Sequence, residues 1–293
     1  MPRSILLSLL SLFMAVESPA GELELDWLQE IPPPLHSSLA ITLGVDDADG
    51  WSRQLDLSLA APLDTRFDLS MGESRVESDE AQLETDFHGL SFTTNPLAEM
   101  SLSLGYEDWG DDDALTIETL WFGLNFNLGN FSLALMPQQR DIRLQVLQWF
   151  QRQVPYVDLQ SRDIGLSLTY YAADDWVFNA AYFSYDYSKD VSQLGDDYRV
   201  IFIFPLNALD LASGLDEYRY SLAVGRLMDE INIDLDWTRS RSAVDNNTAS
   251  VISLSADLPL NDQISLNLIG GIQEVDYSDD QILFANLGLT LFW

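Results

Sequence analysis

Side chains that commonly carry out catalysis are scarce in this chain of 293 residues. It contains no cysteine and two histidines, His36 and His88, which lie far apart in the sequence. Neither a G-x-S-x-G motif nor an H-E-x-x-H motif is present. The acidic segments 46–49 and 107–113 offer oxygen ligands for calcium, but Val45 stands where an EF-hand loop needs its first acidic ligand. We therefore expect no enzymatic activity, no cofactor and no metal site.

Charged side chains recur, however, at alternate positions among small polar residues. Members of this group are Arg66, Asp68, Asp163, Arg219, Asp234 and Asp236, together with Asp56 and Asp257. Successive side chains of a β-strand point to opposite faces, so these residues share a face with the intervening serines, glycines and threonines. If this face lines a barrel, the small side chains leave a water-accessible lumen and the acidic ones favour cations. The alternative is a polar interior that loops fill and that conducts nothing.

Basic residues are concentrated around one segment, 141–156. Arg140, Arg143, Arg152 and Arg162 form the densest basic cluster of the chain. Four apolar residues of the segment lie at helical spacing and predict a short amphipathic helix: Ile142, Val146, Trp149 and Phe150. Folded inward, the arginines would form a constriction that faces acidic residues of the wall. Folded outward, they would bind phosphate groups, which arginine recognises well, or be incidental charges of an external loop.

The elements that position these residues are predicted to be β-strands, because apolar and polar residues alternate from Ser37 onward. Most of the strand-like segments have ten to thirteen residues, more than the roughly five or six that are usual in soluble proteins. They are close to the roughly nine to eleven residues with which a tilted strand crosses a bilayer. Short connections alternate with longer polar loops, as in membrane barrels. Tryptophans near the strand ends match interfacial girdles; they are Trp51, Trp109, Trp121, Trp176, Trp237 and Trp293.

Fourteen strands are predicted, an even number, as expected when both termini lie on one side of the membrane. Their ranges are 37–46, 51–60, 65–75, 81–93, 99–108, 115–126, 131–141, 157–171, 175–188, 216–227, 231–241, 248–258, 263–275 and 281–293. Segment 197–204 also has a strand-like pattern, but it would make the number odd, so we place it inside a long apolar loop, 189–215. Twelve and sixteen strands stay open. Within 81–93 the apolar residues change parity, and a β-bulge near His88 would reconcile them.

The end of the chain, LFANLGLTLFW, has an alternating apolar pattern that stops on an aromatic residue. Its Leu287, Leu289, Leu291 and Trp293 resemble the assembly signal of Gram-negative outer-membrane β-barrels. The resemblance covers residues 37–293 and indicates no subfamily. It implies a porin-like, all-β, transmembrane, antiparallel up-and-down barrel that the barrel assembly machinery inserts. It also implies contacts with outer-membrane lipids and lipopolysaccharide, and leaves the oligomeric state open.

Residues 1–20 have the layout of a cleaved secretory signal peptide. Arg3 precedes an apolar stretch, and the small residues Ser18 and Ala20 stand before Gly21 at the expected cleavage site. Residues 21–36 include three consecutive prolines and form either a periplasmic lead-in, which we favour, or a segment inside the barrel. The predicted organisation is therefore a signal peptide, a lead-in and a barrel over 37–293, located in the cell outer membrane.

The net charge of −33 argues against nucleic-acid binding, because the phosphate backbone would be repelled. Such acidity suits either solubility in a saline habitat or selection for cations. We expect a passive channel for small solutes with a cation bias. The alternative is a non-conducting barrel that anchors or assists an envelope complex through its loops 141–156 and 189–215.

Overall fold

The structure is a computed structural model, and most of the barrel prediction can be compared with it. It describes residues 37–47, 50–62, 64–77, 82–97, 99–111, 115–145, 156–172, 175–189, 191, 215–228, 231–243, 246–276 and 281–293. The predicted signal peptide (1–20), the lead-in (21–36) and the strand-like segment 197–204 lie outside these residues. In the part of the chain that is described, no helix is long and apolar enough to span a membrane.

Fourteen strands follow one another in the part of the chain that the structure describes. They are β1 (Ser38–Asp46), β2 (Trp51–Ala61), β3 (Thr65–Glu77), β4 (Gln82–Leu97), β5 (Met100–Asp111), β6 (Leu115–Leu128), β7 (Phe131–Gln145), β8 (Tyr156–Tyr171), β9 (Trp176–Tyr187), β10 (Asp216–Met228), β11 (Ile231–Ser242), β12 (Thr248–Asn261), β13 (Ile264–Val275) and β14 (Ile282–Phe292). The predicted number of strands is confirmed, and the predicted ranges differ from these mainly in where strands end.

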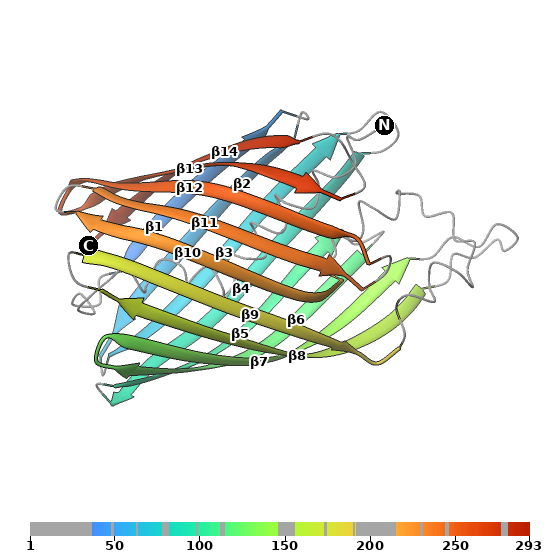
Figure 1. The fold of residues 1–293 in the computed structure, drawn as a ribbon, viewed down its shortest axis with the longest axis horizontal. Coiled ribbons are helices and arrows are strands. Elements are labelled where there is room, and N and C mark those ends of the chain that lie inside the picture. Colours follow the sequence, from blue (N-terminus) through green and yellow to red (C-terminus); the bar gives the residue numbers. More distant parts are fainter. Residues whose placement is uncertain are drawn as a thin grey trace, which may run out of the picture.

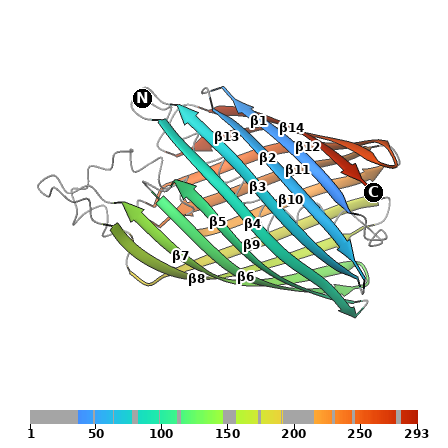
Figure 2. The same ribbon diagram turned by 180° about the vertical axis from the view of Figure 1, so that it is seen from behind.

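The strands form one closed, antiparallel barrel in which each strand pairs with its neighbours in sequence. The first and last strands close it, with a continuous register from Ser38 opposite Phe292 to Asp46 opposite Phe284. In Figures 1 and 2 the strands of the front and back walls cross, because every strand is tilted around the barrel. Closure leaves no unpaired sheet edge, which is what allows a β-sheet to span a bilayer.

The two ends of the barrel differ in their connections. At one end the connections are short: β10 ends at Met228, and β11 begins at Ile231. The start of β1 and the end of β14 lie at the same end of the barrel. We call it the short-turn end. At the opposite, long-loop end, the widest gap between strands runs from Tyr187 to Asp216. In membrane barrels the short turns lie on one side of the bilayer and the longer loops on the other.

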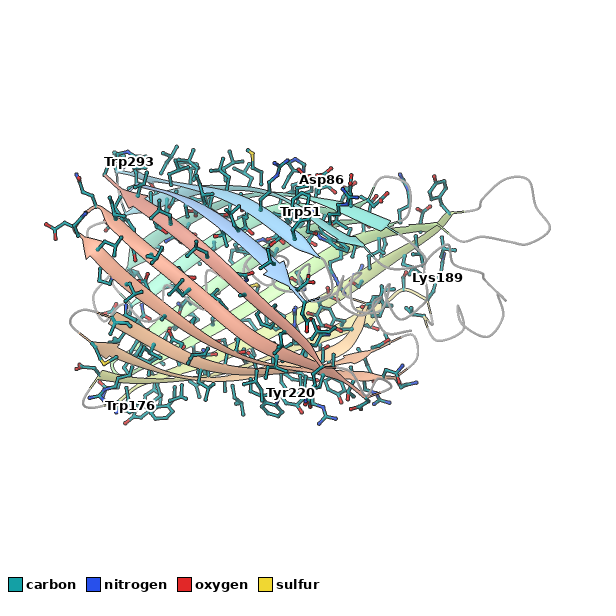
Figure 3. All side chains as sticks on the ribbon, turned by 90° about the horizontal axis from the view of Figure 1, so that it is seen from above. Trp51, Asp86, Trp176, Lys189, Tyr220 and Trp293 are labelled. Atoms are coloured by element: carbon teal, nitrogen blue, oxygen red, sulfur yellow. The ribbon has the colours of Figure 1, made fainter. Side chains whose placement is uncertain are left out.

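A band of exposed apolar side chains surrounds the barrel on its outer face. On β8, for example, Ile164, Leu166 and Leu168 are 52, 49 and 45 % exposed. Such a continuous apolar surface is unfavourable in water but is what a barrel presents to lipid. Figure 3 shows Trp176 and Trp293 at the short-turn end of the barrel wall, consistent with an aromatic girdle.

The girdle prediction is wrong for two of the six tryptophans. Trp109 and Trp121 point into the barrel and are 7 and 4 % exposed. Trp121 lies directly opposite Gly105 on the neighbouring strand, and its indole ring occupies the space that a side chain at Gly105 would need. The ring therefore covers the glycine from within, and its indole N–H donates to Glu107 (2.8 Å).

The strands also change the polarity of their two faces along their length. Near the short-turn end of β8 the outward residues are apolar and the inward ones are small or polar. Beyond Asp163, toward the long-loop end, the outward residues become polar (Arg162, Gln160), whereas the inward Leu159 is 1 % exposed. The barrel wall thus leaves the lipid and continues into water, where its outer face must be polar and its inner face forms an apolar core.

This inversion explains the change of parity within 81–93 and overturns the predicted bulge. The pairing of β3 with β4 runs without a register shift past His88, which lies opposite Met71. Phe87 is inward and 2 % exposed, whereas Leu90 is outward and 56 % exposed. Both residues are apolar, but the first faces the interior above the membrane and the second faces lipid.

Candidate functional site in the barrel lumen

The lumen wall near the short-turn end carries a group of inward aspartates. They are Asp56 on β2, Asp68 on β3, Asp234 and Asp236 on β11, and Asp257 on β12. Asp68 is neutralised by Arg66, whose Nε lies 3.1 Å from its Oδ2. The other four form no ion pair with any residue that the structure describes, and they accept hydrogen bonds from neutral side chains instead, as Asp56 does from Gln54 (2.9 Å). This half of the wall therefore holds an excess of negative charge.

The opposite wall has a different character, because a buried network of arginines, tyrosines and acids spans β7 to β10. Arg140 Nε lies 2.7 Å from Asp163 Oδ2 and also donates to Ser161 Oγ (3.0 Å). A terminal nitrogen of Arg140 donates to the hydroxyl of Tyr187 (3.0 Å), which in turn donates to the backbone carbonyl of Asp216 (2.8 Å). The side chains of Arg140 and Asp163 are 7 and 0 % exposed.

The second arginine of this network, Arg219, packs beside the first through an aromatic ring. It donates to the hydroxyl of Tyr185 (2.6 Å) and lies over the ring of Phe183 at 5.5 Å. Arg140 lies over the Tyr185 ring at 4.5 Å. Both guanidinium groups are thus held by rings and hydrogen bonds, so their positions in the wall are well defined.

Of the predicted constriction residues, the structure brings Arg140, Asp163 and Arg219 together and leaves others apart. For Arg143, the alternative that places it in a lumen constriction is wrong. Its side chain points outward, is 65 % exposed, and pairs with the exposed Asp158 at 3.4 Å. Arg152 lies outside the described residues.

The predicted helix over Ile142–Phe150 is wrong where it can be checked, because β7 continues to Gln145. Ile142 and Val146 are four residues apart, a spacing that fits one face of a helix and equally one face of a strand. Strand alternation prevails up to Gln145, and Ile142 faces the interior with 2 % exposure. Residues 146–155 lie outside the description.

Sequence reasoning missed the apolar layer that lines the interior at the long-loop end. Its members are Phe87, Trp109, Ile117, Ile142, Leu144 and Leu159, which are between 1 and 7 % exposed. Farther round the barrel, Val251, Ile282 and Phe284 are also buried. Among them lies Gln273, which is 0 % exposed and whose amide oxygen and nitrogen have no hydrogen-bond partner among the described residues. The signal that could have revealed this layer was the parity change in 81–93.

The residues of the predicted assembly signal lie on β14 and at the end of the chain. Leu287, Leu289 and Leu291 face outward with 48, 41 and 40 % exposure, and Trp293 is 59 % exposed. The backbone N–H of Trp293 donates to the carbonyl of Ser37 (3.0 Å), which ties the end of the chain to the start of the barrel.

Comparisons with known proteins show which solved structures share this fold. No protein-family description and no curated protein matches the sequence. Among solved structures, the CymD monoaromatic hydrocarbon channel matches with a TM-score of 0.60 and 7% identity, covering 94% of each chain. A FadL homologue of Pseudomonas aeruginosa matches with a TM-score of 0.52 and 9% identity, covering 87% of this chain and 89% of the other. OmpT of Vibrio cholerae matches with a TM-score of 0.50 and 9% identity, covering 88% and 96%. At such identities the likeness shows the fold alone: the chain has the closed antiparallel β-barrel fold of these solved structures.

Proposed function

We propose that the protein is a passive outer-membrane channel for small solutes that prefers cations. The observation that carries the proposal is the group of four lumen aspartates without an ion-pair partner in the described structure, Asp56, Asp234, Asp236 and Asp257. Fixed charges of one sign in a pore wall attract the opposite ion and repel its counterion. The name of one similar structure, the CymD monoaromatic hydrocarbon channel, supports the proposal, because it shows that a barrel of this fold serves as a channel in another protein.

The experiment is a measurement of reversal potential in planar bilayers that separate two concentrations of potassium chloride. We expect discrete channels with a potential of the sign that indicates cation preference. The triple variant Asp234→Asn, Asp236→Asn, Asp257→Asn should move the potential toward zero, because it removes three lumen charges. The preference should also weaken as salt is raised, since the Debye length falls from about 10 Å at 0.1 M to about 3 Å at 1 M.

A matched control changes the same number of charges on the outer face. Asp141, Asp158 and Asp186 are exposed residues with outward parity on β7, β8 and β9. Replacing all three by asparagine should leave the reversal potential unchanged. Equal shifts in the two triple variants would mean that overall charge, rather than the lumen wall, governs ion preference.

The second candidate function is a non-conducting barrel that assists an envelope complex. The buried apolar layer at the long-loop end favours it, because that half of the inner wall is shielded from water. A correctly folded barrel that never conducts in the bilayer experiment would support this candidate and overturn the channel.

Export and partners complete the proposal. We propose that residues 1–20 are removed before Gly21, which N-terminal sequencing of the protein from outer membranes would test.

We further propose insertion by the barrel assembly machinery and contact with lipopolysaccharide above the apolar band. In that region the outward arginines Arg53 and Arg143 are already paired with acidic side chains, so direct phosphate binding by them would have to break those pairs. Catalysis is not part of the proposed function.

A further inference from the structure

We infer that Arg226 and Trp176 form a site on the outer face of the barrel for the headgroup phosphate of an anionic phospholipid. The lipid belongs to the leaflet on the side of the short turns. The site lies on the lipid-facing surface, so it goes beyond the proposed channel and does not depend on conduction through the lumen.

Arg226 stands out by its charge. On the strands that the structure describes, it is the only charged residue that points outward in the short-turn half of the barrel. The residues opposite it on the neighbouring strands are Trp176 and Ile233. An arginine on a lipid-facing wall is costly at the centre of the bilayer and tolerated near the interface. Arg226 lies two residues before the end of β10 at Met228, and its long side chain extends the reach of the guanidinium group toward the headgroups.

The guanidinium group of Arg226 lacks an acidic partner. The residue is exposed, and its Cζ lies over the Trp176 ring at 5.4 Å from the centroid. With the residues that the structure describes it forms no ion pair and no hydrogen bond. Arg162 lies opposite Asp186 on β9. The other outward arginines are all paired with acidic side chains; they are Arg53, Arg75, Arg143, Arg239 and Arg241. Arg226 is therefore left to bind an anion from outside the protein.

A headgroup phosphate supplies that anion at the depth of Arg226. A guanidinium group binds two phosphate oxygens at once through parallel N–H groups. The indole N–H of Trp176 is a further donor that has no acceptor among the described residues, and Trp176 is 39 % exposed. Figure 3 shows Trp176 at the short-turn end of the wall. The contact with the ring also orients the guanidinium group, so two neighbouring strands present donors to one phosphate.

The wall next to this pair suits the acyl chains of the same lipid. Toward the middle of the apolar band, Phe178 and Leu222 point outward and are 46 and 50 % exposed. In the opposite direction lies Asp175, which is exposed and precedes Trp176 in the turn, and its charge repels a phosphate placed beyond the strand end. A phosphate at Arg226 with acyl chains on the apolar band is thus favoured over a free anion, which would gain only the first contact.

The test measures the unfolding of the barrel by urea in two kinds of vesicle: phosphatidylcholine alone, and phosphatidylcholine mixed with phosphatidylglycerol. The phosphate of phosphatidylcholine is accompanied by a positive choline, so phosphatidylglycerol is the stronger ligand. Arg226→Gln should lower the folding equilibrium constant more in the mixed vesicles than in phosphatidylcholine. We expect the two effects to differ by about fivefold, the factor that one arginine contributes near an anionic membrane surface.

A matched control removes the same charge elsewhere. Arg143 is exposed beyond the apolar band and is paired with Asp158, so Arg143→Gln should have the same effect in both kinds of vesicle. Arg226→Lys keeps the charge and should retain most of the dependence on phosphatidylglycerol. Trp176→Phe keeps a ring but loses the N–H donor, and it should retain only part of it. These two conservative variants give a second route if Arg226→Gln does not fold.

Three outcomes would overturn the site. Equal dependence on phosphatidylglycerol in Arg226→Gln and Arg143→Gln would mean that overall charge is responsible. Loss of the dependence in Arg226→Lys would mean that the guanidinium packs against the ring without binding phosphate through its charge. An effect reproduced by sodium phosphate on phosphatidylcholine vesicles, at an ionic strength matched with sodium chloride, would mean that the ligand is a free anion. None of these results bears on the channel, because the reversal potential of Arg226→Gln should equal that of the parent protein.

Discussion

Replacing Arg140 by methionine should destabilise the barrel strongly, because it leaves a buried carboxylate without its counterion. The side chain of Asp163 is 0 % exposed, and Arg140 Nε lies 2.7 Å from its Oδ2. Breaking a buried ion pair from one side costs about 3–5 kcal/mol, since the remaining buried group is left without its counterion. The decrease in unfolding free energy should exceed what the lost packing of the aliphatic part of Arg140 alone would give, because the hydrogen bond from Arg140 to Tyr187 is lost as well.

The control is an exposed pair on the outer face of the same two strands. Arg143 lies 3.4 Å from Asp158, and the two side chains are 65 and 75 % exposed. Pairs of this kind contribute about 0–1 kcal/mol, because water and salt screen them. The variant Arg143→Met should therefore be close to the parent protein in stability, although it removes the same kind of group.

The assay is equilibrium unfolding by urea of the barrel in lipid vesicles, followed by tryptophan fluorescence, with a double-mutant cycle over Arg140→Met and Asp163→Leu. We expect the double variant to be more stable than Arg140→Met alone, because an apolar pair of similar volume removes the unpaired charge. If Arg140→Met cost no more than Arg143→Met, or if the two changes in the cycle were simply additive, the reasoning about the buried pair would be refuted.

Three further predictions follow from the faces of the strands. Leu166→Arg, within the lipid-facing band, should cost about 2–4 kcal/mol of unfolding free energy, whereas Gln160→Arg, outward but above the band, should cost little in the same assay. Gly165→Ala should lower stability by about 1–3 kcal/mol through overpacking, because its Cβ would overlap the ring of Phe183; no loss of stability would contradict the packing. Trp293→Ala should leave the refolded barrel intact but reduce its yield in outer membranes, and an unchanged yield would argue against an assembly signal.

Much of the architecture could be predicted because one face of each strand contacts lipid and must be apolar, whereas the other faces the interior and is small or polar. Alternation such as Ile164-Leu166-Leu168 against Gly165 and Ser167 reports this difference directly. The same pattern placed Asp234 and Asp236 on the inner face. The ends of strands were less certain, since β4 extends to Leu97, past the predicted end at 93.

What the pattern could not show is which apolar face meets lipid and which meets a protein interior, because both are apolar. The sequence thus determined that strands alternate and which residues share a face, and it favoured fourteen strands over twelve or sixteen. The tertiary structure decided that Phe87 faces inward and Leu90 outward, because the barrel wall continues beyond the membrane into water.

Only the closed barrel, likewise, brings Arg140, Asp163 and Tyr187 together from β7, β8 and β9. Their contact depends on the register between neighbouring strands, which long-range hydrogen bonding sets and which a local pattern does not contain. The chain alone therefore specified a membrane barrel with an acidic interior face. Strand pairing decided which of those charges pair with an arginine and which form no ion pair among the described residues.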